Sequence, residues 1–166
     1  MTLNSFQFNT TPGLRYGSGQ AKDSCEEISN KLGQSILFIT DKGLMSLGLT
    51  EQTLKELKKI SSVEIFDDVE ADPSKKTLLK AIEVGKKIKA TGVIGFGGGS
   101  SMDVAKLTAL ILGSGENLEE AWGVANAKGP RLPLVLIPTT AGTGSEVTPV
   151  SIITVGKEEK KGVSSS

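Results

Sequence analysis

The stretch from Thr91 to Ala109 constrains the fold more than any other part of the sequence. It joins a largely apolar run, 93–96, to three consecutive glycines and then to a helical pattern that begins at Ser100. A strand, a glycine turn and a helix start in this order are typical of a nucleotide-binding unit, because the free N–H groups of a helix N-terminus attract phosphate. We expect Ser100 to cap this helix, with Asp103 completing a capping box.

Two interpretations of this glycine turn, residues 97–101, remain open at the level of residues. Its sequence, G-G-G-S-S, matches neither the Rossmann fingerprint nor the P-loop. It is therefore either a phosphate site or a connection in which glycines allow a strand and a helix to pack closely. The residues that would bind a cofactor phosphate here are Gly97, Gly98, Gly99, Ser100 and Ser101.

Apolar runs that alternate with helical patterns predict the fold class. Ser35–Thr40 and Leu132–Pro138 are continuous apolar runs of the kind that parallel sheets bury on both faces, and Val63–Phe66 is a shorter strand. Helical patterns occupy Gln20–Leu32, 50–59, 73–90 and Ser100–Leu112. The expected fold is α/β, a Rossmann-like parallel sheet flanked by helices. Because its apolar residues lie nearly all round, the helix after the glycine turn should be buried against the sheet and a second element.

The two ends of the chain carry β patterns outside this alternation. Near the N-terminus, apolar residues alternate with polar ones at Phe6 and Phe8, and again at Leu14 and Tyr16. We expect one cofactor-binding domain over residues 1–166, in which 1–18 form a β arm and 147–166 form a β extension with a charged hairpin tip.

Asp41 follows the strand Ser35–Thr40 directly. A carboxylate at the end of a strand in a nucleotide-binding sheet can accept hydrogen bonds from a ribose diol, and it repels a 2′-phosphate. It can equally be the N-cap of the segment that follows, and one residue could serve both purposes.

A second loop rich in small residues follows the strand Leu132–Pro138. Its sequence, T-T-A-G-T-G-S-E-V-T at 139–148, holds more hydroxyl groups than a plain turn needs, and we call it the hydroxyl loop. Hydroxyls and N–H groups of small residues can donate to a diphosphate or an amide without steric bulk. The candidate binding residues are Thr139, Thr140, Thr143, Ser145 and Thr148.

Composition excludes several functions. The chain has no histidine, so it cannot itself supply a histidine base or a His-ligated metal. Its 19 basic and 19 acidic residues balance, which argues against binding to nucleic acid or an anionic membrane. Cys25 is the single cysteine and fits a reducing compartment. With neither a secretory leader nor a membrane-spanning apolar run, we expect a cytoplasmic protein.

An acidic run follows the strand Val63–Phe66. Four carboxylates, at Asp67, Asp68, Glu70 and Asp72, could suggest a site for a hard cation, but the glycine and terminal glutamate of a calcium loop are missing. The simpler interpretation is a solvated loop, in which Asp72 caps the next helix and Pro73 is its first residue.

The glycine turn, the hydroxyl loop and the strand-end acid together resemble the iron-containing (group III) alcohol dehydrogenase family, which has a dehydroquinate-synthase-like fold. The similar segments cover essentially the whole chain and are Asp41 with Lys42, Gly97–Lys106, Pro138–Thr148 and Glu159–Gly162. The resemblance implies binding of NAD or NADP. Gly98, Gly99 and Ser100 would lie along the diphosphate. The hydroxyl loop would lie near the diphosphate and the nicotinamide ribose. Asp41 would meet the adenosine ribose and favour NAD.

The resemblance also implies parts that this sequence does not contain. Family members have a helical C-terminal domain whose one Asp and three His residues bind Fe2+ or Zn2+, and they commonly dimerise through N-terminal β segments. We therefore expect a fragment of an NAD-dependent alcohol dehydrogenase, acting on a small alcohol or aldehyde, that binds cofactor without catalysing hydride transfer and assembles as a homodimer or a larger homo-oligomer.

Two other functions remain possible from the sequence. A non-catalytic nucleotide-binding module would use the same two loops without chemistry. A phosphotransferase would place glycine loops around ATP, but the P-loop Lys-Ser/Thr pair is missing, and Asp103 is the one acid near the glycines that could bind Mg2+.

Overall fold

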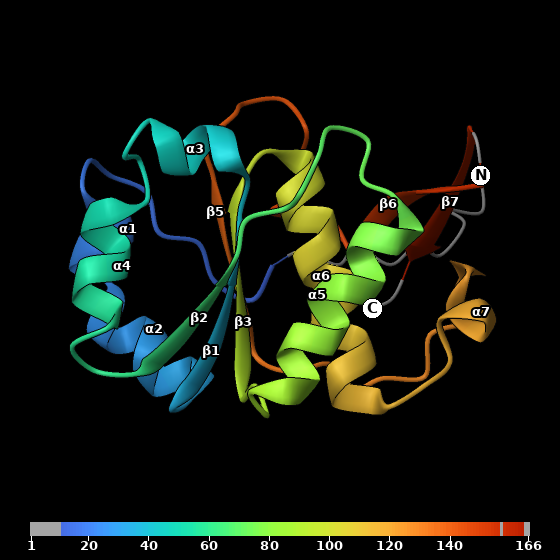
Figure 1. Ribbon diagram of the computed structural model, residues 1–166, viewed down its shortest axis with the longest axis horizontal. Coiled ribbons are helices and arrows are strands. Elements are labelled where there is room, and N and C mark those ends of the chain that lie inside the picture. The colour runs from blue at the N-terminus through green and yellow to red at the C-terminus, as the bar shows by residue number, and fades with distance from the viewer. Residues whose placement is uncertain (1–10, 157, 165–166) are drawn as a thin grey trace, which may run out of the picture.

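Four parallel strands form the central sheet of the computed structural model, which describes residues 11–156 and 158–164 (Figure 1). Their spatial order is β2-β1-β3-β5. Ile36 lies opposite Gly92 and Ile39 lies opposite Gly95, so β1 and β3 run in register from end to end. The strands are β1 (Ser35–Ile39), β2 (Ser62–Phe66), β3 (Gly92–Gly97) and β5 (Leu134–Pro138). The predicted α/β fold with a parallel sheet is confirmed.

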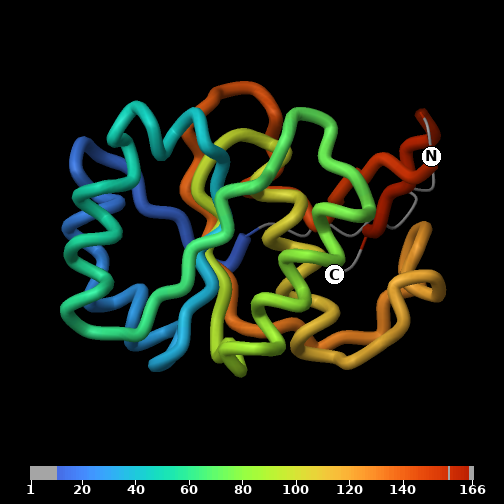
Figure 2. Tube along the Cα trace, in the orientation of Figure 1, coloured from blue at the N-terminus to red at the C-terminus, as the bar shows by residue number. Residues whose placement is uncertain are grey.

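Helices cover both faces of this sheet, as the tube in Figure 2 also shows. One face carries α1 (Gln20–Asp23), α2 (Cys25–Leu32) and α4 (Glu51–Leu57), and the other carries α5 (Lys75–Lys87) and α6 (Gly99–Ser114). Side chains of β1 alternate between two cores: Ile36 and Phe38 face the first group of helices, while Leu37 and Ile39 face the second. The short helix α3 (Lys42–Ser46) lies across the carboxyl ends of the strands.

Helix α6 is buried on two sides. On one side it packs so closely against β3 that a methyl group built on Gly95 would lie 2.7 Å from Ala105 Cβ. On the other side, Ile153 and Val163 of a second sheet join the core that α6 shares with α5. This second sheet has the order β4-β7-β6, with β4 (Gly123–Val124), β6 (Val150–Val155) and β7 (Glu159–Ser164). The predicted burial of α6 by two elements is confirmed.

Two predicted helix starts are wrong. Gly98, with an extended backbone, is the N-cap of α6, so Ser100 lies inside the first turn and its side chain is not the cap. Ser74 begins α5, because its side chain accepts the N–H of Thr77 and its own N–H is held by Glu70. Asp72 lies two residues earlier and has a left-handed backbone with φ 52, so α5 cannot extend back to it.

Other boundaries differ in smaller ways. The helix predicted from Gln20 to Leu32 is divided at Ser24 into α1 and α2. A further short helix, α7 (Leu118–Ala121), follows α6. The predicted C-terminal hairpin is present as β6 and β7, which pair antiparallel. None of the helices within the described ranges is long and apolar enough to cross a membrane.

The N-terminal β arm predicted over residues 1–18 stays a prediction, because more than half of it lies outside the described residues. Phe6 and Phe8 lie outside the described residues. In the described part, 11–18, no strand forms, and the two apolar side chains of the predicted alternation are open to solvent: Leu14 is 73% exposed and Tyr16 is 98% exposed.

Candidate nucleotide site

The carboxyl ends of β1, β3 and β5 bring the sequence-predicted residues to one edge of the sheet (Figure 1). Asp41 and Gly97 each follow the paired residues Ile39 and Gly95 by two positions, so they lie at the same level of the sheet. The N–H of Thr139 donates to the carbonyl of Gly97 over 2.9 Å, which extends the β3–β5 pairing into the start of the hydroxyl loop. This edge is where ligands bind in parallel α/β sheets.

The glycine turn and the hydroxyl loop lie face to face. A methyl group built on Gly98 would lie 3.3 Å from Thr140 Oγ1, and one built on Gly99 would lie 3.3 Å from Thr143 Cγ2. The two loops therefore approach this closely because neither glycine carries a side chain. The 16-residue helix α6 begins at this point, beside the cavity that Gly99 lines, so the N–H groups of its first turn can meet an anionic group there.

Asp41 caps helix α3 and keeps a carboxylate oxygen for another partner. Its Oδ1 accepts the N–H of Leu44 over 2.9 Å, which confirms the capping interpretation. The other oxygen, Oδ2, receives no hydrogen bond within the described residues, and the residue is half-buried. The geometry is therefore compatible with a ribose hydroxyl on the free oxygen while the cap stays in place.

Helix α6 holds the hydroxyl loop through a charged pair that the sequence analysis did not recognise. The ammonium of Lys106 donates to the carbonyl of Ser145 over 2.9 Å, to that of Thr148 over 3.3 Å, and to that of Val150. It also lies 3.1 Å from Asp103 Oδ1. Lys106 is only 9% exposed, so this pair is part of the interior.

Asp103 makes a second connection to the same segment. Its Oδ1 accepts the hydroxyl of Ser145 over 2.6 Å, and its Oδ2 accepts the N–H of Ile152 over 3.0 Å. The predicted role of Asp103 in a capping box is wrong, because its carboxylate points to the hydroxyl loop and β6. A clue was present in the sequence: D-x-x-K puts two charges on a helix that is otherwise apolar all round, and such charges must be paired.

Burial and nearby negative charge have opposite effects on the pKa of Lys106. Its removal from water lowers the pKa of the ammonium below the usual value, while the carboxylates of Asp103 and Glu146 favour the charged form. The four oxygen partners of the nitrogen are the contacts expected of an ammonium ion and not of a neutral amine.

A small cavity of about 200 Å3 opens between the start of α6, the hydroxyl loop and β6. One side of its lining is polar and the other is formed by apolar side chains of β6. The lining residues are Gly99, Asp103, Thr143, Ser145, Thr148, Val150 and Ile152. A cavity with a few convergent polar groups and an apolar wall is typical of a small-ligand site.

The remaining predicted residues divide into open and buried positions. Thr139, Thr140 and Thr143 are exposed along the open side of the loop, whereas Ser145 is buried against Asp103. Ser101 is only 2% exposed and lies beneath Gly97. We therefore interpret Ser101 as part of the packing of the glycine turn.

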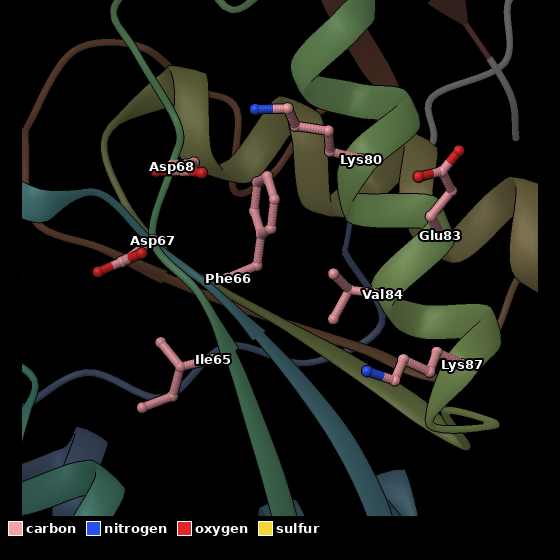
Figure 3. Close-up of a pocket in the computed structure, with 8 residues that line it drawn as sticks. All are labelled: Ile65, Phe66, Asp67, Asp68, Lys80, Glu83, Val84 and Lys87. Carbon is pink, nitrogen blue, oxygen red and sulfur yellow. The ribbon is translucent and has the colours of Figure 1, made fainter.

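A larger hollow, of about 410 Å3, lies between β2 and α5 at the sheet edge (Figure 3). Its walls carry charges of both signs, from Asp67, Asp68, Lys80, Glu83 and Lys87. Carboxylates of the acidic run bond to the protein: Asp68 pairs with Lys42, Glu70 accepts from Ser74 and Thr77, and Asp72 pairs with Lys160. Within the described residues, no three potential ligands among His, Cys, Asp and Glu gather at a metal-binding geometry.

Known proteins share both the sequence pattern and this fold. Residues 12–166 match the family described as iron-containing alcohol dehydrogenase. A sulfoacetaldehyde reductase of Bilophila wadsworthia is 32% identical over 162 residues, which cover 96% of this chain and 42% of that protein. An NAD-dependent methanol dehydrogenase of Bacillus methanolicus is 32% identical over 148 residues, which cover 89% of this chain and 39% of that protein.

A solved structure extends the comparison to three dimensions. The sulfoacetaldehyde reductase of Bifidobacterium kashiwanohense in complex with NAD+ aligns with a TM-score of 0.82 at 28% identity, over 98% of this chain and 43% of that chain. The present chain thus spans about two fifths of the length of the curated relatives it matches. The extent of the family match and the shared fold lead to one conclusion: the chain belongs to the iron-containing alcohol dehydrogenase family.

Proposed function

We propose that this chain is the cofactor-binding part of an NAD-dependent, metal-requiring alcohol dehydrogenase that acts on a small alcohol or aldehyde. The observation that carries the proposal is the close approach of the glycine turn, at the start of α6, to the hydroxyl loop beside the cavity that Gly99 and Thr143 line. The family supports the same conclusion, since one relative is an NAD-dependent methanol dehydrogenase and a structural neighbour was solved with NAD+.

In this proposal each part of the sheet edge binds one part of the dinucleotide. The N–H groups of Gly98, Gly99 and Ser100 bind the diphosphate at the start of α6. Hydroxyls of Thr139, Thr140 and Thr143 bind the diphosphate and the adjoining ribose, and the cavity beside Thr148 accepts the nicotinamide end. The free oxygen of Asp41 binds the adenosine ribose and disfavours a 2′-phosphate.

In this proposal the cofactor-binding residues of this chain and a metal site elsewhere in the complete enzyme make separate contributions to the chemistry. Bound NAD supplies a hydride acceptor, and this chain's residues hold and orient it. We assign no metal ligand in this chain, because it has no histidine and its described carboxylates do not gather. In the proposal, the Fe2+ or Zn2+ that would polarise the substrate oxygen is bound elsewhere in the full-length enzyme.

A parallel titration tests the proposal. Tryptophan fluorescence or calorimetry would follow the binding of NADH and NADPH to the chain, with ATP and Mg2+ as the control for a phosphotransferase. We expect NADH to bind and NADPH to bind more weakly, because the proposal places the carboxylate of Asp41 at the adenosine ribose, where it would repel a 2′-phosphate. Binding of ATP with no binding of either nicotinamide cofactor would contradict the proposal.

A further inference from the structure

Three backbone carbonyls converge on one nitrogen atom at the base of the hydroxyl loop. They belong to Ser145, Thr148 and Val150, and they all accept from the ammonium of Lys106. The negative ends of three carbonyl dipoles and the carboxylate of Asp103 meet in the interior, where their mutual repulsion is poorly screened. This backbone conformation therefore requires a cation at its centre.

The lysine side chain supplies that cation from the helix that also forms the opposite wall of the cofactor space. Gly99, at the first position of α6, faces Thr143, and Lys106 lies about two helical turns further along the same helix. A rigid helix thus sets the distance between the glycine turn and the hydroxyl loop. Asp103 acts in the same direction by holding Ser145 and Ile152.

We propose that Lys106 is a positioning residue for cofactor binding: its ammonium acts as a tethered cation that holds the carbonyls of the hydroxyl loop and so places the loop opposite the glycine turn. The inference rests on the proposed function, because it takes the hydroxyl loop to be one wall of the NAD site. Lys106 does not touch the cofactor in this arrangement and acts through the backbone of residues 145–150.

The test compares Lys106→Met, which keeps the apolar stem and removes the charge, with Lys76→Met on the exposed face of α5 as the matched control. Amide hydrogen exchange of residues 143–152, measured without cofactor, should become at least about tenfold faster in Lys106→Met, as expected when local opening becomes about 1.4 kcal/mol easier. The amides of β1 and β3 should keep their protection. Exchange at wild-type rates in 143–152 would overturn the proposal.

A binding measurement separates positioning from a purely structural role. In Lys106→Met, the Kd for NADH should rise about tenfold while that for AMP, which needs only the adenosine end near Asp41, stays the same. A loosened loop with an unchanged Kd for NADH would overturn the positioning role. Wild-type protein that binds no NADH would instead refute the proposed function, while the exchange experiment would still decide whether Lys106 orders the loop.

A second variant covers the case in which Lys106→Met unfolds the whole chain. Lys106→Gln keeps an N–H donor for a loop carbonyl but carries no positive charge to hold the three carbonyls together. Faster exchange confined to residues 143–152 supports the proposal. Exchange identical to wild type in this segment, in a folded Lys106→Gln protein, overturns it.

Discussion

At the scale of single residues, Asp41 shows how one side chain can serve the fold and the ligand together. One carboxylate oxygen caps α3 through Leu44, and the other faces away from that bond. Gly43 makes the arrangement possible, because a methyl group there would lie 3.0 Å from the capping oxygen. Stability and cofactor preference at this position can therefore be separated by the right substitution.

Asp41→Asn and Asp41→Ala make that separation. Asparagine caps a helix as well as aspartate does, so Asp41→Asn should keep the stability of the wild type. It should narrow the preference for NADH over NADPH by about fivefold, because the repulsion between two like charges near 4 Å in water is about 1 kcal/mol. Asp41→Ala should narrow the cofactor preference in the same way, and it should also lower the free energy of unfolding by about 1 kcal/mol because the cap is lost. Cofactor titrations and urea denaturation measure the two effects. A preference that Asp41→Asn leaves intact would limit Asp41 to capping.

The place of Asp41 at the sheet edge could be predicted from the sequence, whereas the contacts of Lys106 could not, and the reason is physical. The position of Asp41 follows from local order, since a residue directly after a buried strand must lie at the sheet edge. The role of Lys106 depends on three carbonyls that are 39 to 44 residues away in the chain, and no local pattern specifies where a loop will point its backbone. Ser101 also needed the structure, because whether it faces a ligand or the sheet depends on where the helix begins.

At the scale of elements, the interface between β3 and α6 sets how closely the glycine turn can approach a ligand. The strands, the main helices and the C-terminal hairpin followed from hydrophobic periodicity, which burial against a sheet directly imposes. The helix starts did not, because Gly98 and Ser74 become caps through backbone geometry and neighbouring hydrogen bonds. Gly95 is one of the tightest points between this strand and helix, since a Cβ there would lie 2.7 Å from Ala105 Cβ of α6, and it would also lie 2.9 Å from Leu136 of the neighbouring strand β5.

Gly95→Ala should accordingly destabilise the protein by about 1–3 kcal/mol, the usual range for added volume in a filled core. Gly13→Ala is the matched control, because nothing lies within 4 Å of the added methyl group, and it should stay within about 0.5 kcal/mol of wild type. Urea denaturation followed by circular dichroism gives both values. Equal midpoints for the two variants would show that α6 can move away from the sheet without loss.

At the scale of the whole molecule, the described residues form the proposed cofactor edge and contain no cluster of three potential metal ligands. It spans about two fifths of the curated relatives, and it contains no histidine. The absence of a histidine site can be read from the sequence alone, because a count of zero excludes such a site whatever the fold.

We expect the chain by itself to show no turnover when it is incubated with NAD, a series of short alcohols and either ferrous or zinc ion under anaerobic conditions, with NADH formation followed by its absorbance. The reason is that nothing in its described residues can hold the metal that polarises the alcohol oxygen. A full-length relative assayed in the same buffer is the positive control. NADH production above the enzyme-free blank would refute the expectation.

The strand order of the central sheet also affects how the chain folds while it is being synthesised. Ile36 in β1 finds its β3 partner, Gly92, 56 residues later, and at 5–20 residues per second the ribosome needs about 3–11 s to reach it. During that interval a strand that ends fully buried on both faces has only the edge strand β2 to pair with. We therefore expect the folded yield to depend on how well this apolar segment is shielded during translation, until the second half of its sheet emerges.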